Sequence, residues 1–216
     1  MPGASNLIII GAGGHALSVA DAALSSGWTV VGFVSPDGEG PASTYGQVFS
    51  SVESINLSGT ALALGIGTNH SRELAARDIA NRYPQIEIAT VVHKTAFIST
   101  HARVLPGAVV LAHAAVGPGS SVGPGALLNT GASLDHESSL ADFASLGPGA
   151  RTGGNVFVGE RTMVGMQAGI LHGIRVGSDS VVGAHSLINA DVENNIVAWG
   201  TPAKKIRTRF KDDPYY

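Results

Sequence analysis

Residues 134–169 read LDHESS LADFAS LGPGAR TGGNVF VGERTM VGMQAG, six hexapeptides that each begin with an apolar residue or threonine. The period runs without insertion over residues 98–193, which makes sixteen hexapeptides. The fifth residue of each hexapeptide is small or β-branched, so two positions per repeat can face inward. A hexapeptide period of this kind is typical of a parallel β-helix. Three hexapeptides form one triangular coil, and the whole array is roughly 25 Å long at about 4.8 Å per coil.

The corners of this coil are predicted from turn dipeptides. Proline followed by glycine recurs at the third and fourth places of a hexapeptide, at Pro106-Gly107, Pro118-Gly119, Pro124-Gly125 and Pro148-Gly149. Proline fixes φ and glycine accepts a positive φ, which suits a tight corner. Each hexapeptide is therefore one short strand and one corner, and residues eighteen apart stack on each other.

Composition limits the possible functions. The chain has 216 residues, 44% hydrophobic and 13% charged, which fits a protein with a buried core. The only N-terminal apolar run, residues 7–10, is too short for a signal peptide or a membrane span, so we expect a cytoplasmic protein without membrane attachment. The absence of cysteine agrees with this. A net charge of −3 without a basic cluster argues against nucleic acid and for small-molecule partners.

The first 92 residues have a different pattern. Strands are predicted at residues 7–10, 28–34, 60–66 and 86–92, and helices at 16–24 and 71–83, with a loop of at most short structure over 36–58. Strands that alternate with helices predict a small parallel α/β sheet of the Rossmann type. We expect three segments: an α/β domain over 1–92, a β-helix over 93–198 and a C-terminal tail over 199–216.

A glycine-rich turn follows the first predicted strand. Residues 11–16, GAGGHA, open the first helix, where glycines let a phosphate approach the backbone and the helix N-terminus favours negative charge. The motif alone fits either a structural turn or nucleotide binding, and the short domain fits a nucleotide-sugar better than a dinucleotide. Asp37 is an irregular match for the acidic residue expected after the second strand. Residues 65–69, GIGTN, end the third strand on the same sheet edge.

His136 is the candidate general base. It occupies the third place of its hexapeptide, which faces outward, and Glu137 follows it. A carboxylate next to an imidazole can raise its basicity and hold its orientation, although an exposed pair without function has the same pattern. Eighteen-residue stacking puts Pro118 below His136 and Gly154 above it, with His172 above that.

Two further expectations follow from the stacking. The backbone amides of Gly153 and Gly154 are predicted to be uncovered near His136, where they could receive an acyl oxygen. A second outward column, formed by Pro148, Met166 and Ala184, lacks charge and bulk, which suits an extended arm such as pantetheine, coil packing or a subunit contact.

A zinc site is the alternative use of the histidines. Catalytic zinc needs several imidazoles that converge. The coil histidines are His101, His113, His136, His172 and His185. They occupy different repeat places and none forms a close pair in sequence, so we expect no metal.

Together these motifs resemble a known family. The GAGGH turn, the GIGTN segment with Arg72, the hexapeptides, residues 134–137 (LDHE) and the closing GTPAK of residues 200–204 resemble the sugar O-acyltransferases of the sialic acid O-acetyltransferase type. The nucleotide-linked 4-amino-sugar N-acetyltransferases, of the bacillosamine and perosamine type, are the most similar members. The resemblance extends to about Arg207.

The resemblance implies a left-handed β-helix, a homotrimer, and acetyl-CoA bound in the cleft between subunits. It implies that the N-terminal domain binds the nucleotide-sugar. The resemblance implies that His136 is the general base and Glu137 its acidic partner. It implies acetyl-CoA contacts at Ser145, Gly154, Met166 and Ala184. It implies substrate contacts at Gly13, Gly14, His15, Ser35, Asp37 and Gly67.

The chain departs from the family pattern at two places. Relatives often have two acids after the second strand, whereas this chain has Ser35-Pro36 before Asp37, so base and ribose recognition differ. Relatives often have a second histidine nine residues after the catalytic one, and this chain has Ser145, whose hydroxyl can donate a hydrogen bond but cannot act as a base.

The sequence therefore predicts an acetyl-CoA-dependent N-acetyltransferase that acts on the amine of a UDP- or dTDP-linked 4-amino-4,6-dideoxy sugar. His136 would take the proton, Gly154 would receive the oxyanion, and no metal or covalent acyl-enzyme would be needed. Lys204 and Lys205 could meet the CoA phosphates or form a solvated tail. The alternatives are O-acetylation of sialic acid or another sugar, and a nucleotide-sugar-binding trimer without chemistry.

Overall fold

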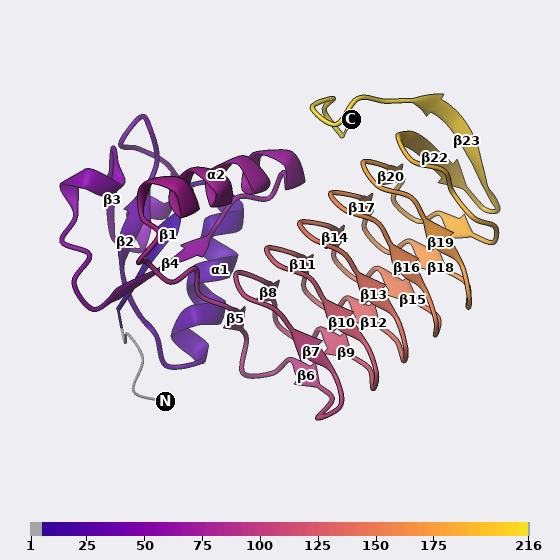
Figure 1. The fold of residues 1–216 in the computed structure, drawn as a ribbon, viewed down its shortest axis with the longest axis horizontal. Helices are drawn as coiled ribbons and strands as arrows, with labels where there is room; N and C mark the ends of the chain where they lie inside the picture. The colour runs from indigo at the N-terminus through magenta and orange to yellow at the C-terminus, as the bar shows by residue number, and fades with distance from the viewer. Residues whose placement is uncertain (1–5, 216) are drawn as a thin grey trace.

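A computed structural model describes residues 6–215, which form a small α/β domain followed by a parallel β-helix (Figure 1). The expected segments therefore lie within the described chain except for residues 1–5 and 216. Within residues 6–215, no helix is both long and apolar enough to cross a bilayer.

The N-terminal domain is a parallel sheet with the strand order β3-β2-β1-β4. Its elements are β1 (Asn6–Ile10), α1 (Gly14–Ser25), β2 (Thr29–Val34), η1 (Pro41–Thr44), β3 (Gln47–Phe49), η2 (Val52–Ser54), β4 (Thr60–Leu64) and α2 (Asn69–Arg82). The central strand β1 is almost entirely buried between its neighbours, as its apolar sequence predicts.

The segment 36–58 contains only short elements, as expected, but one of them, β3, is the fourth strand of the sheet and pairs with β2 through Phe33 and Val48. The expectation for the last strand of this domain is wrong. Residues 86–92 do not form a full strand of this sheet, because only Ile88 makes a bridge to Leu62. Val91–Val92 (β5) pairs instead with β8 of the β-helix, so the chain joins the coil two residues before the expected boundary.

Two-residue strands form the three faces of the coil. The first face contains β7 (Arg103–Val104), β10 (Ser121–Val122), β13 (Ser139–Leu140), β16 (Phe157–Val158) and β19 (Arg175–Val176). The second contains β5, β8 (Val109–Val110), β11 (Leu127–Leu128), β14 (Ser145–Leu146), β17 (Met163–Val164) and β20 (Val181–Val182), and ends in β22 (Ile196–Gly200) and β23 (Ala203–Thr208). The third contains β6 (Phe97–Ile98), β9 (Ala115–Val116), β12 (Ser133–Leu134), β15 (Arg151–Thr152), β18 (Gly169–Ile170) and β21 (Leu187–Ile188).

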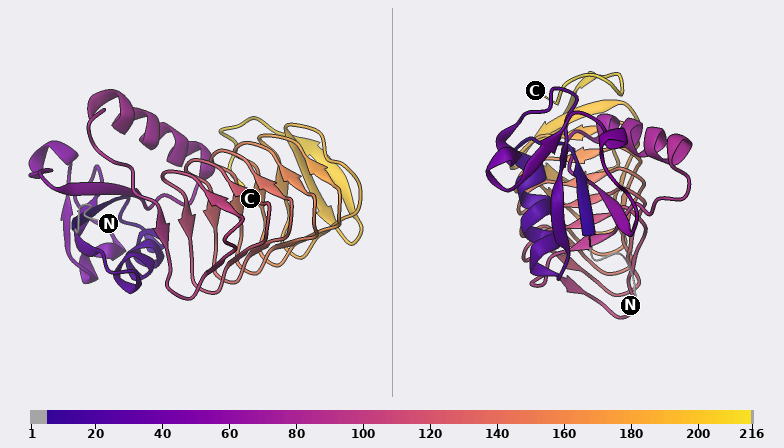
Figure 2. Two further views of the ribbon diagram at one scale, coloured as in Figure 1. Left: turned by 60° about the horizontal axis from the view of Figure 1, so that its bottom comes forward. Right: turned by 90° about the vertical axis from the view of Figure 1, so that its left-hand side faces the viewer.

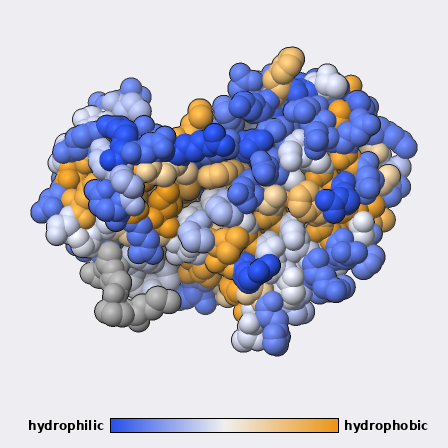
Figure 3. Space-filling view, viewed as in Figure 1, coloured by the Kyte–Doolittle hydropathy of each residue, from blue (hydrophilic) through white to orange (hydrophobic). Residues whose placement is uncertain are grey.

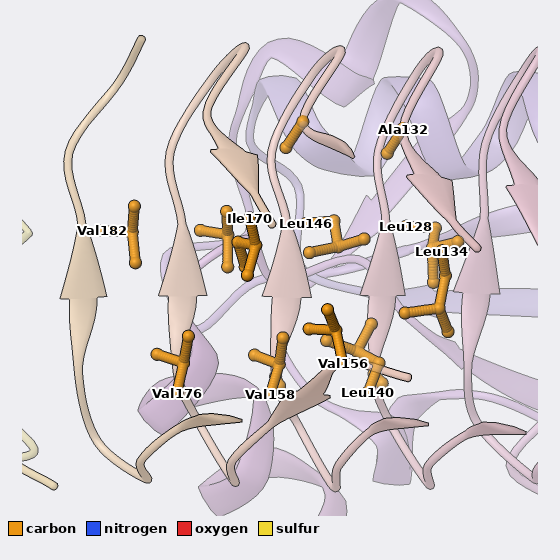
Figure 4. Packing of buried hydrophobic residues seen from close by; sticks show 14 of the residues in the cluster. Leu128, Ala132, Leu134, Leu140, Leu146, Val156, Val158, Ile170, Val176 and Val182 are labelled. Carbon is orange, nitrogen blue, oxygen red and sulfur yellow. The ribbon is translucent and has the colours of Figure 1, made fainter. Parts of the chain in front are cut away.

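The apolar first residues of the hexapeptides fill the coil interior. Leu134, Leu140 and Leu146 are at most 1% exposed, and Figure 4 shows them inside the coil together with Val158 and Val176. Each coil repeats this arrangement, because register partners lie eighteen residues apart, as in the pair Ser121 and Ser139. From Gly107 to His185 every fourth-place residue has φ between 54° and 75°, so the left-handed corner occurs even where the sequence lacks glycine.

The N-terminal domain covers the first end of the coil, as the end-on view in Figure 2 shows. Apolar residues of α1, including Ala16 and Val19, share one buried cluster with Val109 and Leu127 on the second face of the coil. Polar side chains lie along the upper edge over α2, whereas apolar side chains gather below it on the coil (Figure 3). The two parts are therefore joined by a packed junction.

The C-terminal segment, from residue 196 to residue 215, packs against the coil and the N-terminal domain. β22 and β23 pair antiparallel, and the chain then runs back along the coil toward α2 (Figure 1). The backbone amide of Asn69, at the start of α2, donates to the hydroxyl of Tyr215 at 2.7 Å. The expected tail, residues 199–216, thus contains the end of β22 and all of β23, and it reaches the N-terminal domain.

Candidate functional site

The third and fourth places of the hexapeptides form three columns, one at each corner of the coil. The histidine corner contains Pro118, His136, Gly154 and His172, the docking corner contains Gly125, Phe143, Arg161 and Asp179, and the methionine corner contains Pro148, Met166 and Ala184. At the histidine corner the Glu137 amide donates to the Pro118 carbonyl at 2.9 Å, and the Asn155 amide donates to the His136 carbonyl at 2.8 Å. The predicted stacking order is therefore correct.

The imidazole of His136 lies directly against Gly154. A Cβ atom built on Gly154 would be 2.2 Å from both Cε1 and Nε2 of His136. Only glycine leaves room for the ring in this position. Nδ1 of His136 is 3.2 Å from Oε2 of Glu137, so the neutral tautomer that donates from Nδ1 leaves the Nε2 lone pair on the side of Gly154.

Asp135 fixes the backbone that carries His136, a role that sequence reasoning missed. Its Oδ1 accepts a hydrogen bond from the His136 amide at 2.7 Å, and its own amide donates to Oγ1 of Thr152 at 3.0 Å. A side-chain oxygen that bonds the next backbone amide is a common turn device of aspartate. The Asp-His-Glu run is the only sequence signal for this contact.

One of the two predicted oxyanion donors already donates a hydrogen bond within the coil. The Gly153 amide donates to the Ile170 carbonyl at 2.8 Å, so the expectation that it is uncovered is wrong. Its place in the ladder between β15 and β18 explains this. The Gly154 amide has no acceptor among residues 6–215. A single donor therefore remains beside the His136 ring.

His172 adds a second imidazole to the histidine corner. Its ring centroid is 6.2 Å from that of His136, with an interplanar angle of 42°. The eighteen-residue stacking predicts this proximity, although no role for His172 was predicted. The residues of this corner thus present an exposed imidazole with a carboxylate partner, a buried glycine amide without an acceptor in the described chain, and a neighbouring ring.

The glycine turn at the start of α1 is open to solvent. Cβ atoms built on Gly13 and Gly14 would meet nothing within 4 Å, and no side chain caps the helix. A ligand can therefore reach the backbone amides of the first turn, where the helix dipole favours an anion. The structure brings Gly67 to the same place, because a Cβ there would be 3.7 Å from Cβ of His15.

His15 is a partly buried member of this loop. Burial, and secondarily the nearby Arg72 guanidinium, lowers the pKa of His15 to about 4, so its ring is neutral at physiological pH. Its Nε2 is buried without a hydrogen-bond partner in the described chain. An unpartnered buried nitrogen is costly unless a ligand or water satisfies it. Ser35 and Asp37 lie just beyond the end of β2, and the Asp37 side chain is exposed.

The predicted acetyl-CoA residues fall in three places, of which the histidine corner, with Gly154, is described above. At the methionine corner the Gln167 amide donates to Pro148 and the His185 amide donates to Met166, each at 2.8 Å, so the expected column exists. Met166 is 48% exposed. Ser145 instead lies on the second face, on β14, and is buried.

The structure thus forms two separate clusters of candidate residues. His136, Glu137 and Gly154 lie at the histidine corner. Gly13, Gly14, His15 and Gly67 lie in the N-terminal domain, which contacts the docking corner through Arg72. Lys205 pairs with Glu193 at the far end of the coil. Among residues 6–215, no three histidine, aspartate or glutamate side chains are arranged to hold a metal ion.

Comparisons with known proteins match both parts of the chain. Residues 6–79 match the model of the PglD N-terminal domain, and residues 155–190 match the bacterial transferase hexapeptide model of six repeats. A curated chloramphenicol acetyltransferase from Klebsiella aerogenes is 42% identical over 50 residues. The match spans 23% of this chain and about a quarter of the length of that relative (24%).

Solved structures match over nearly the whole chain. A histidine-to-alanine variant of GDP-perosamine N-acetyltransferase from Caulobacter crescentus, in complex with CoA and GDP-perosamine, is 30% identical, with a TM-score of 0.88 over 94% of this chain and 97% of that one. The acetyltransferase domain of PglB from Neisseria gonorrhoeae, in complex with acetyl coenzyme A, is 29% identical with a TM-score of 0.88, over 94% of this chain and 100% of that one.

These matches confirm the predicted fold class, a small parallel α/β domain followed by a left-handed β-helix of hexapeptide repeats. They also confirm the resemblance on which the sequence analysis relied. The chain belongs to the hexapeptide-repeat sugar acyltransferases of the sialic acid O-acetyltransferase and perosamine N-acetyltransferase type.

Proposed function

We propose that this protein transfers the acetyl group of acetyl-CoA to the amine of a nucleotide-linked 4-amino-4,6-dideoxy sugar. The observation that carries the proposal is the position of the His136 ring, which lies against Gly154 with Glu137 at Nδ1 and beside a backbone amide, that of Gly154, without an acceptor in the described chain. The likeness to perosamine N-acetyltransferase, which binds CoA and GDP-perosamine, supports the substrate class. No metal ion takes part in the proposed reaction.

The proposed chemistry is a direct transfer. Nε2 of His136 accepts a proton from the sugar amine while the nitrogen attacks the thioester carbon, and a carbon–nitrogen bond forms. The Gly154 amide stabilises the oxyanion of the tetrahedral intermediate. The carbon–sulfur bond then breaks, and protonated His136 returns the proton to the CoA thiolate. Atoms and charges balance without a covalent enzyme intermediate.

The two clusters receive different parts of the reactants. The N-terminal loop, with Gly13, Gly14, His15 and Gly67, binds the nucleotide diphosphate, because its open amides favour an anion. We assign the nucleoside contacts to Ser35 and Asp37, which follow the end of β2. Titration with GDP, UDP and dTDP identifies the base: the sequence favours UDP or dTDP, whereas the Caulobacter relative binds GDP-perosamine.

We also propose that the active unit is a homotrimer. The histidine corner and the docking corner are different corners of one coil, so the loop of one protomer can serve His136 of a neighbour. Acetyl-CoA would then lie between subunits, along Met166 and Ala184 of the methionine corner and near Ser145. A sedimentation mass of one chain at working concentration would contradict this arrangement.

Replacement of His136 tests the chemical proposal. Because general-base catalysis contributes about a thousandfold, His136→Ala should lower turnover by about that factor, while nucleoside diphosphate binding stays unchanged. His101→Ala, which removes another exposed coil histidine, is the matched control and should keep full turnover. Near-normal turnover of His136→Ala would refute the assignment.

A further inference from the structure

Arg72 is the most completely buried charged side chain at the junction between the two parts, with 1% of its surface exposed. It lies in the first turn of α2, three residues after Asn69. Burial lowers the pKa of Arg72 to about 10, so the guanidinium remains charged at neutral pH. A buried charge of this kind requires a full set of hydrogen bonds.

Five oxygen atoms surround this guanidinium, and none of them belongs to a carboxylate. Nε donates to the Gly125 carbonyl at 2.7 Å, and Nη2 donates to the Phe143 carbonyl at 2.9 Å, both in the docking corner. Nη2 also donates to Oδ1 of Asn69 at 2.8 Å. Nη1 donates to the carbonyls of Ile66 and Gly67, each at 3.0 Å.

These last two bonds orient the loop that contains Gly67. In a trans peptide the carbonyl and the amide of one plane point in opposite directions. Because the Ile66 and Gly67 carbonyls point to Arg72, the amides of Gly67 and Thr68 point away from it. Neither amide has an acceptor in the described chain, and Gly67 lies beside His15.

We propose that Arg72 is the positioning residue of the nucleotide-sugar loop: it ties the loop to the docking corner and turns the Gly67 and Thr68 amides toward the nucleotide. This inference rests on the proposed function of the loop. The planar guanidinium is necessary because its fork bonds several carbonyls in fixed directions, which a lysine ammonium cannot do.

The C-terminal segment supports the same junction from the other side. Tyr215 accepts the Asn69 amide, and the Asn69 side chain donates to the carbonyls of Arg161 and Thr162 at 3.0 and 3.1 Å. The Arg209 guanidinium lies 5.7 Å from the Tyr215 ring and donates to the Asp179 carbonyl. The last residues of the chain therefore help to hold α2 in place.

Three variants test the proposal. Arg72→Lys keeps the positive charge but removes the planar guanidinium that bonds several carbonyls, and Tyr215→Phe removes the hydroxyl that accepts the Asn69 amide. Arg77→Lys is the control. Arg77 lies on the same helix, but its side chain is 70% exposed and bonds only Glu73 in the described structure. Arg72→Lys should raise the KM for the nucleotide-sugar about tenfold and leave the KM for acetyl-CoA within about twofold. Tyr215→Phe should raise the first KM about threefold, and Arg77→Lys should change neither.

Parallel changes in both KM values with a lower melting temperature would show a purely structural role and overturn the proposal. Unchanged KM values in Arg72→Lys and Tyr215→Phe would also overturn it. If Arg72→Lys does not fold, Tyr215→Phe tests the proposal instead: its KM for the nucleotide-sugar should rise while its KM for acetyl-CoA stays unchanged. Calorimetric titration with GDP, UDP and dTDP measures binding without turnover, so it separates this inference from the proposed function. A wild-type protein that binds a nucleoside diphosphate but releases no thiol from acetyl-CoA would refute the proposed function and leave this inference standing.

Discussion

The coil and the N-terminal domain hold their candidate residues by different means. In the coil, His136 is placed by contacts that recur every eighteen residues, with Pro118 below and Gly154 above. In the N-terminal domain, the Gly67 loop is held by one buried side chain, Arg72, which bonds coil carbonyls 53 and 71 residues away in sequence. Under the proposed function, the repetitive coil fixes the imidazole that reacts, and the loops of the N-terminal domain bind the substrate.

Substitution of Gly154 tests how the coil positions His136, and its effect should be larger than that of the pH change described below. A methyl group there would lie 2.2 Å from the His136 ring, so the ring must turn away. We expect Gly154→Ala to lower turnover about a hundredfold, because misplacement of a catalytic group by about 1 Å costs about that much. The affinity for nucleoside diphosphate, measured by calorimetry, should not change.

Gly169→Ala is the matched control for this prediction. Its added Cβ would meet only Cδ1 of Leu187, at 3.6 Å, an ordinary contact. Equal turnover in Gly154→Ala and Gly169→Ala would show that the packing of the His136 ring against Gly154 is not needed for turnover.

A smaller effect should appear in the N-terminal domain when pH is lowered. Burial, with a contribution from Arg72, lowers the pKa of His15 to about 4, whereas an unfolded histidine titrates near 6.5. The unfolded chain therefore binds a proton that the folded chain rejects. The stability that depends on neutral His15 is fully present above about pH 6.5 and is lost as pH falls toward about 4.

Urea denaturation at pH 7 and pH 4.5 measures this effect. Between these values the wild type should lose about 2 kcal/mol more unfolding free energy than His15→Gln, which has no imidazole to protonate. Equal losses in the two proteins would mean that His15 is not held in a neutral, buried state.

The same difference explains what the sequence could predict. The coil follows from local periodicity, so the stacking of Gly154 on His136 could be inferred by counting residues. The period could not show that the Gly153 amide donates to the Ile170 carbonyl, because this depends on where in the hexapeptide the strand hydrogen bonds end and the corner begins. Nor could it show how Asp135 bonds the His136 backbone.

The N-terminal domain was harder to predict because its contacts are distant in sequence. Residues 47–49 form an edge strand although Gly46 and nearby serines suggest a loop, since pairing with β2 outweighs local propensity. Val91 and Val92 have an apolar pattern that fits either sheet, and they pair with the coil. The environment of Arg72 has no signal in the sequence beyond its place near the GIGTN segment.

The most direct test of the proposed function is thiol release from acetyl-CoA by the wild-type protein. A nucleotide-linked 4-amino-4,6-dideoxy sugar and the same sugar with a 4-hydroxyl group should be compared, with GDP, UDP and dTDP as the nucleotide. The proposal predicts rapid release with an amino sugar and little with its hydroxyl counterpart. Release with the hydroxyl sugar instead would indicate an O-acetyltransferase, and the absence of release with any acceptor would contradict the proposed transfer.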